Sequence, residues 1–182
     1  MDMRIERTKK NVINAFLQLR SGKPLEKITV KELSALAEIN KATFYLHYHD
    51  VYDLSEQLEN EVVFSTLHSI EHPELIFSDT KRFTRELAEG FLANEQLINI
   101  LFEGSRSSCF VTLFEKELKN LIIKVHPEYE ETLEKNAAIT YLIYGGYYTY
   151  FKYGKYDKEA VFNLIENMSD AIVKLYELEK GK

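Results

Sequence analysis

Residues 29–54 read TVKELSALAEINKATFYLHYHDVYDL and predict two short helices, a tight turn between them and the start of a third helix. Thr29 and Glu32 stand three positions apart, which is the spacing of a capping box at a helix start. The apolar residues behind them recur at helical spacing, at Val30, Leu33, Leu36 and Ala37. One face of this first helix is therefore expected to be buried, with Lys31, Glu32 and Ser34 on the solvent side.

A second helix is expected to begin after Asn40, because asparagine is a favourable N-cap residue. Helical spacing from Lys41 to Tyr48 buries Phe44 and Tyr48 on one side. The other side then carries Lys41, Thr43, Tyr45 and His47. Lysine, threonine, tyrosine and histidine all offer polar contacts, so this outer side is expected to touch another molecule.

Length and composition are those of a soluble globular protein with one large core or two small ones. No apolar run approaches the roughly 18 residues of a membrane span, and the first ten residues, MDMRIERTKK, lack the apolar region of a signal peptide. A cytoplasmic protein is expected. The single cysteine, Cys109, can form neither an internal disulfide nor a multi-cysteine metal site, and is expected to be packed in the core.

Charge is distributed unevenly along the chain, whose net charge is −6. Residues 1–49 hold nine Lys and Arg against five Asp and Glu, a net charge of +4, so the remainder carries −10. The field that a polyanion meets is local, because salt screens charges beyond about 8 Å. The basic N-terminal part is thus compatible with nucleic-acid binding, although +4 is equally compatible with an ordinary solvated surface.

The periodicity of the whole chain predicts an all-α protein of about nine helices, with no strand pattern and no internal repeat. Residues 1–49 form a predicted three-helix domain whose first helix spans 4–20. Residues 50–182 form a second predicted helical domain. It starts with a connector helix at 50–72 and a linker at 73–79. The remaining helices are predicted at 80–93, 95–103, 108–125, 129–153 and 158–179.

The last two predicted helices are apolar over more than one stripe, which favours a second helical partner for each. Two glycines in the first of them cost about 1 kcal/mol each and are often accepted where another helix approaches closely. We expect a symmetric homodimer joined by a four-helix bundle; the alternative is that both helices are central helices of a monomer. The interface would contain Ile139, Leu142, Gly145, Gly146, Leu164, Ile165, Met168 and Ile172.

The stretch at 29–54, with T-F-Y-x-H-Y at 43–48 behind a capped helix, closely resembles the N-terminal signature of the TetR family of bacterial transcriptional regulators. The clear resemblance covers about residues 4–58. It implies a helix-turn-helix domain, in which the second helix enters the DNA major groove, and an all-helical core that dimerises through its last two helices. It also implies that the chain acts as a DNA-binding regulator, a repressor of transcription, on a two-fold symmetric operator.

The residues that the resemblance places at DNA are Thr29, Lys31, Asn40, Lys41, Ala42, Thr43, Tyr45, Leu46, His47 and His49. The chain departs from the family at the turn, where Glu38 stands in place of the usual glycine and is expected to adopt a strained backbone conformation. His49 and Val51 replace basic residues that usually follow the recognition helix. Phosphate contact at the start of the connector helix is correspondingly reduced.

The resemblance further implies a small-molecule effector that binds in the helical core and releases the DNA. Candidate pocket residues are Val62, Phe83, Leu87, Phe91, Ile98, Phe102, Phe114 and Tyr144, although helical spacing fits plain core packing for each of them. An aromatic lining suits an apolar or aromatic compound.

Motifs of catalysis and cofactor binding are missing from the sequence: there is no G-x-G-x-x-G, P-loop or H-E-x-x-H. We therefore expect neither an enzyme nor a cofactor. His68 and His72 have the spacing of a metal pair but no clear third ligand, and are expected to be solvent-exposed residues near a helix end. The alternative function is a dimeric, all-helical protein-interaction module without specific DNA binding.

Overall fold

The computed structural model describes residues 3–176, with the side chains of Met3 and Ser105 left aside. Over these residues the protein is all-helical, without strands, as the sequence predicts. The chain divides into two compact units, one of residues 1–62 with 96–108 and one of residues 63–95 with 109–182. Compared with the predicted division after residue 49, the first unit also takes in the start of the connector helix and a later segment of the chain.

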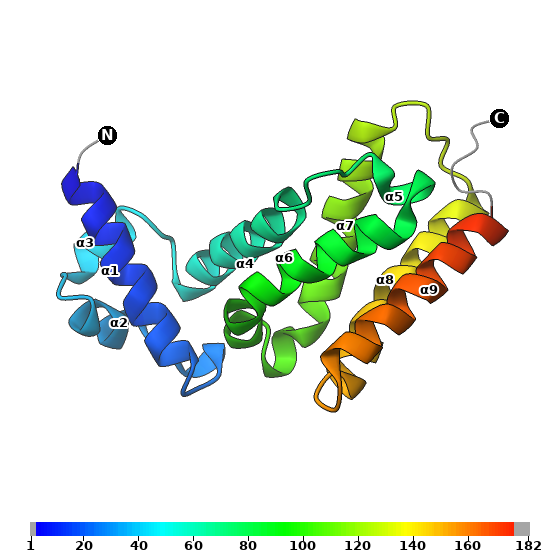
Figure 1. The fold of residues 1–182 in the computed structure, drawn as a ribbon. Helices are drawn as coiled ribbons and strands as arrows, with labels where there is room; N and C mark the ends of the chain where they lie inside the picture. Colours follow the sequence, from blue (N-terminus) through cyan, green and yellow to red (C-terminus); the bar gives the residue numbers. More distant parts are fainter. Residues whose placement is uncertain (1–2, 177–182) are drawn as a thin grey trace. The chain divides into compact units, whose positions relative to one another are not determined.

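The first unit is built from four helical segments followed by the start of a fifth helix (Figure 1). They are α1 (Met3–Arg20), the 3-10 helix η1 (Leu25–Lys27), α2 (Val30–Leu36), α3 (Lys41–Tyr45) and the first turns of α4 (Val51–His68). Their apolar faces meet in a small core. Its fully buried members are Val12, Phe16, Leu25, Leu33, Phe44 and Leu54.

Side-chain caps start three of these helices where the sequence predicts them. The hydroxyl of Thr29 accepts a hydrogen bond from the Glu32 amide at 3.2 Å, and Asn40 Oδ1 accepts one from the Thr43 amide at 2.7 Å. Asp50 Oδ1 accepts a hydrogen bond from the Asp53 amide at 2.8 Å. Since the first amides of a helix lack partners within it, these caps fix where α2, α3 and α4 begin.

Several details of the first unit differ from the prediction. The capping box is one-sided, because the Glu32 carboxylate pairs with Lys23 Nζ at 2.5 Å instead of returning to Thr29. Ser34, predicted to be solvated, is buried and its hydroxyl finds no partner among the described residues. Leu36 is exposed although its stripe was predicted to be buried, because α2 ends at this residue.

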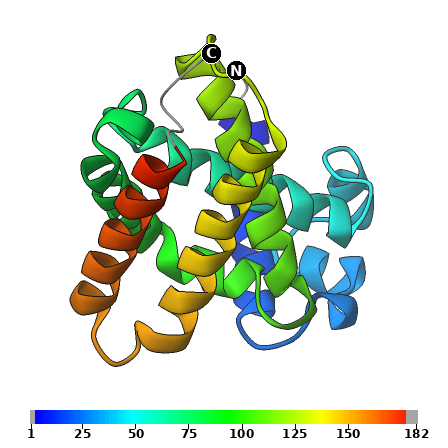
Figure 2. The same ribbon diagram turned by 90° about the vertical axis from the view of Figure 1, so that its right-hand side faces the viewer.

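The second unit contains the end of α4 and most of the later helices. They are α5 (Leu75–Ser78), most of α6 (Thr80–Leu101), most of α7 (Ser107–Val125), α8 (Leu133–Tyr153) and α9 (Lys158–Leu175). The end of α6, the 3-10 helix η2 (Gly104–Arg106) and the first residues of α7 belong to the first unit. Figures 1 and 2 both show α8 and α9 side by side, and a short connection makes them antiparallel. The final predicted turn, up to Glu179, lies outside the described residues.

Two predicted boundaries in this region are wrong. The helices predicted at 80–93 and 95–103 form one continuous α6, and the Asn94 side chain bonds back to the Gly90 carbonyl at 2.9 Å instead of breaking the helix. The predicted linker at 73–79 contains α5, whose Ile76 and Phe77 are buried. In addition, α8 begins after its N-cap Thr132 rather than at residue 129.

Candidate DNA-binding surface and ligand pocket

The residues predicted to contact DNA lie at the start of α2 and on and just after α3, and none of them is buried. Tyr45 is 56% exposed and Leu46 is 81% exposed, whereas their neighbours Phe44 and Tyr48 are buried at 0% and 5%. The ring of Phe44 packs against those of Tyr45 and Tyr48, each with centroids 5.5 Å apart. The buried rings therefore hold α3 in place, and its opposite side is left free for a partner.

Two of the predicted contact residues already make local bonds. The Thr43 hydroxyl donates to Asn40 Oδ1 at 3.1 Å, so its hydroxyl supports the N-cap of α3 and its methyl group is the part left for base contact. The His49 amide donates to Asp53 Oδ2 at 2.8 Å. The hydrogen bond from the Gln57 side chain and then this bond from His49 lower the pKa of Asp53. A carboxylate therefore lies beside His49.

The turn between α2 and α3 contains the backbone feature predicted from the departure at Glu38. Its φ is +55°, in the left-handed region, and it is the one non-glycine residue with positive φ among residues 3–176. A side chain in this conformation costs roughly 1–2 kcal/mol relative to the right-handed region. The turn thus keeps the shape that glycine would give it, at a cost in stability.

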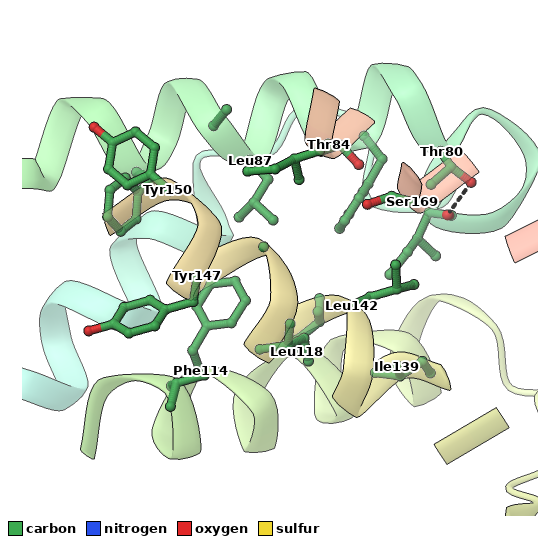
Figure 3. Close-up of a pocket in the computed structure, with 18 of the residues that line it drawn as sticks. Thr80, Thr84, Leu87, Phe114, Leu118, Ile139, Leu142, Tyr147, Tyr150 and Ser169 are labelled. Atoms are coloured by element: carbon green, nitrogen blue, oxygen red, sulfur yellow. Dashed lines mark hydrogen bonds between the residues drawn. The ribbon is translucent and has the colours of Figure 1, made fainter. Parts of the chain in front are cut away.

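An apolar pocket lies within the second unit, between α5, α6, α7, α8 and α9 (Figure 3). Its volume is about 160 Å³. None of the residues that line it is charged. An aromatic cluster forms one wall, with Phe110 stacked on Phe114 at 5.7 Å and on Tyr147 at 5.3 Å.

Hydroxyl groups gather at the other end of the pocket. Figure 3 shows Thr80 and Thr84 of α6 near Ser169 of α9, away from Tyr147 and Phe114. All three hydroxyl residues are buried, with exposures of 4%, 9% and 8%. The Thr80 hydroxyl donates to the Ile76 carbonyl at 3.0 Å, whereas no hydrogen bond to another described residue is found for the hydroxyls of Thr84 and Ser169.

Four of the eight residues predicted for the ligand site line this pocket: Phe83, Leu87, Phe91 and Phe114. Val62, Ile98 and Phe102 belong to the first unit, where they are buried as core. Tyr144 does not line the pocket, and its hydroxyl lies 3.5 Å from that of Thr112. Helical spacing predicts that a residue faces a core but does not say which of the two cores it faces. This explains why only half of the predicted residues line the pocket.

The predicted dimer residues fall into two groups. Ile139, Leu142, Gly146 and Ile165 line the pocket, so they face into their own unit. Gly145 has open space where a side chain would stand, Ile172 is half-buried, and Leu164 and Met168 are 50% and 47% exposed. Exposed Tyr141, Tyr148 and Leu175 follow at helical spacing. We call Tyr141, Gly145, Tyr148, Leu164, Met168 and Leu175 the exposed apolar face.

The polar residues of the pocket were not predicted. Thr80, Thr84 and Ser169 are ordinary helix residues in the sequence, and only their apolar neighbours at helical spacing could have indicated burial. Tyr150, at the aromatic end, has its hydroxyl 2.6 Å from Glu95 Oε1, and Glu95 also pairs with Lys158 at 2.6 Å. Burial and this bond raise the Tyr150 pKa to about 12, so the hydroxyl stays neutral.

The two histidines with metal-like spacing in the sequence contact different partners in the structure. His68, at the end of α4, is exposed and stacks on Phe64 with centroids 3.6 Å apart. His72, beyond the helix, lies 2.9 Å from Glu86 and 2.8 Å from an Arg82 nitrogen. Among residues 3–176 no three histidine, cysteine or carboxylate side chains come together as a metal site.

Over the same residues, every helix is too short or too polar to span a bilayer. Comparison of the chain with protein-family models, with curated proteins and with solved structures finds no match.

Proposed function

We propose that this chain is a ligand-responsive transcriptional regulator, a repressor that binds a two-fold symmetric DNA operator as a homodimer and is released by a small molecule. The resemblance to the TetR family supports this proposal through the stretch at 29–54. The alternative, a dimeric protein-interaction module, shares the fold but gives no role to the excess of positive charge in residues 1–49.

The observation that carries the proposal is the free side of α3. The buried side chains of Phe44 and Tyr48 hold the helix against the core of the first unit, while Lys41, Tyr45 and Leu46 remain exposed. A short helix presented in this way behind a tight turn is the arrangement that places a recognition helix in the major groove. Lysine suits phosphate or guanine, tyrosine suits the backbone, and leucine suits a thymine methyl group.

A second copy of the chain supplies the other half of the operator contact. The exposed apolar face on α8 and α9 carries five large side chains that are 47–73% exposed in one copy, and exposed apolar surface is common at interaction sites. In a two-fold dimer each copy would cover the face of the other. Two α3 helices would then meet half-sites about 34 Å apart, one turn of DNA.

A ligand can influence DNA binding because α6 takes part in both units. Its first four turns line the pocket with Thr80, Thr84, Leu87 and Phe91, and its last residues, 96–101, belong to the first unit. A shift of this helix upon ligand binding would reach the first unit directly. Helix shifts of about 1–2 Å at subunit interfaces are known to accompany allosteric switching in other proteins.

The experiment is a gel-shift titration with the DNA upstream of the chain's own gene. Lys41→Ala and Tyr45→Ala should each weaken binding by about 1–3 kcal/mol without affecting dimerisation. Lys155→Ala and Tyr156→Ala, exposed residues of the second unit, serve as matched controls and should leave affinity unchanged. If the α3 variants bind as tightly as the wild type, the DNA-binding proposal fails and the interaction module is favoured.

A further inference from the structure

We propose that the pocket of the second unit binds a small uncharged molecule of about one aromatic ring, with one hydrogen-bonding group directed at the hydroxyls of Thr84 and Ser169. The claim that this molecule is the effector rests on the proposed function. The claim that the pocket binds such a molecule rests on the structure of the pocket alone.

Size sets the first limit on the ligand. The pocket volume of about 160 Å³ is close to that of an engineered protein cavity of about 150 Å³ that binds benzene. The aromatic wall of Phe110, Phe114 and Tyr147 offers ring faces and edges to such a molecule. A planar ring gains both burial and aromatic contact there.

Charge sets the second limit. No lining residue is ionisable in the neutral pH range, and both lining tyrosines, Tyr147 and Tyr150, have pKa values raised to about 12 by burial. An ion placed in this pocket would lose its hydration without gaining an opposite charge, which is very costly. Carboxylates and protonated amines are therefore excluded.

The hydroxyl end sets the third limit. Thr84 and Ser169 are more than nine-tenths buried, approach the same end of the pocket from two helices, and have no hydrogen bond to another described residue. Buried hydroxyls normally have partners, because each unmade bond is unfavourable. A ligand hydroxyl or carbonyl group would supply that partner to both side chains at once.

Isothermal titration calorimetry of the full chain, without DNA, tests the inference with three related probes. They are para-ethylphenol, ethylbenzene and para-ethylbenzoate at neutral pH, which share the ethylbenzene frame and differ in the group at the para position. The wild type should bind para-ethylphenol about three- to tenfold more tightly than ethylbenzene, the range expected for one net hydrogen bond. It should not bind para-ethylbenzoate detectably.

The double variant Thr84→Val with Ser169→Ala should bind the phenol and ethylbenzene equally, since it keeps the shape of the pocket without its hydroxyls. Thr66→Val, another buried threonine of the same unit outside the pocket, should retain the wild-type preference. The inference is overturned by any of three outcomes: no preference in the wild type, an unchanged preference in the double variant, or binding of the benzoate as tight as that of the phenol. Failure of all three probes to bind also overturns it.

Failure of the proposed function has a separate signature. If the chain binds the phenol as described but does not bind DNA, the inferred ligand site stands and the proposed regulatory function fails. If the chain binds DNA but none of the probes, the proposed regulatory function stands and the inferred ligand class is wrong.

Discussion

Arg20, at the end of α1, donates through Nη2 to the backbone carbonyl of Leu101 at the end of α6, over 3.3 Å. The same nitrogen lies 3.1 Å from the carbonyl of Glu103, and Nη1 lies 3.3 Å from that of Lys23. Arg20 is only 2% exposed. The last carbonyls of a helix have no partners within it and favour a cation, so Arg20 caps α6 within the first unit.

Replacing Arg20 with methionine should therefore lower the free energy of unfolding by about 1–3 kcal/mol, because buried carbonyls lose their donors. Arg7→Met, on the exposed part of the same helix, should change it by less than about 0.5 kcal/mol. Urea denaturation of the two variants makes the comparison. Equal stabilities would mean that water replaces the guanidinium without cost.

Glu38 offers a stabilising substitution. Glycine adopts a φ of +55° without the steric cost that glutamate bears, although it also gains freedom in the unfolded chain. Glu38→Gly should raise the free energy of unfolding by about 0.5–1 kcal/mol. Glu38→Ala, which keeps a side chain at the same φ, is the control and should bring no gain; a gain in both variants would assign the effect to lost charge.

The exposed apolar face should be the dimer interface. Met168→Glu and Leu164→Glu introduce charge at side chains that are half exposed in one copy, and either should yield monomers in sedimentation at concentrations where the wild type is dimeric. Gly146→Ala is the control, because Gly146 faces Ile165 of its own unit. Dimers that survive both glutamate variants would place the interface elsewhere.

Acid should weaken the contact between Glu95 and Lys158. The bonds from Lys158 and Tyr150 lower the Glu95 pKa below its unfolded value of about 4.3. Their contribution to stability is thus complete above that value and is lost as the pH falls through the lower folded pKa. The stability difference between the wild type and Glu95→Gln should narrow over this acid range.

Glu56→Gln provides the comparison for that titration, since Glu56 is an exposed carboxylate for which no side-chain bond to another described residue is found. At neutral pH its stability should differ from that of the wild type by less than about 0.5 kcal/mol. Urea midpoints measured from neutral pH downward follow the Glu95→Gln difference. A Glu95→Gln difference that does not change with pH would show that the ion pair is too well solvated to affect stability.

Local signals in the sequence predicted the first unit well. Thr29, Asn40 and Asp50 are side-chain caps whose chemistry acts within three residues, so the starts of α2, α3 and α4 follow without knowledge of the fold. The burial of Phe44 and Tyr48 beside exposed Tyr45 follows from helical spacing in the same way.

The second unit depends on contacts that the sequence does not encode locally. The single turn α5 is held by the burial of Ile76 and Phe77 rather than by helix propensity. In α8, residues of neighbouring stripes are equally apolar, so nothing in the sequence says that Gly146 faces inward and Gly145 outward. From the sequence alone, the residues of α8 that line the pocket could therefore not be told apart from those on the exposed apolar face.

The most direct test of the proposed function is selection of bound duplexes from a random DNA pool with the full chain. The account predicts enrichment of a two-fold symmetric site whose half-sites are centred about 34 Å apart or a multiple of that distance. The Tyr45→Ala variant should enrich the same site weakly or not at all. Repeated selection that enriches no sequence with the wild-type chain would contradict the account.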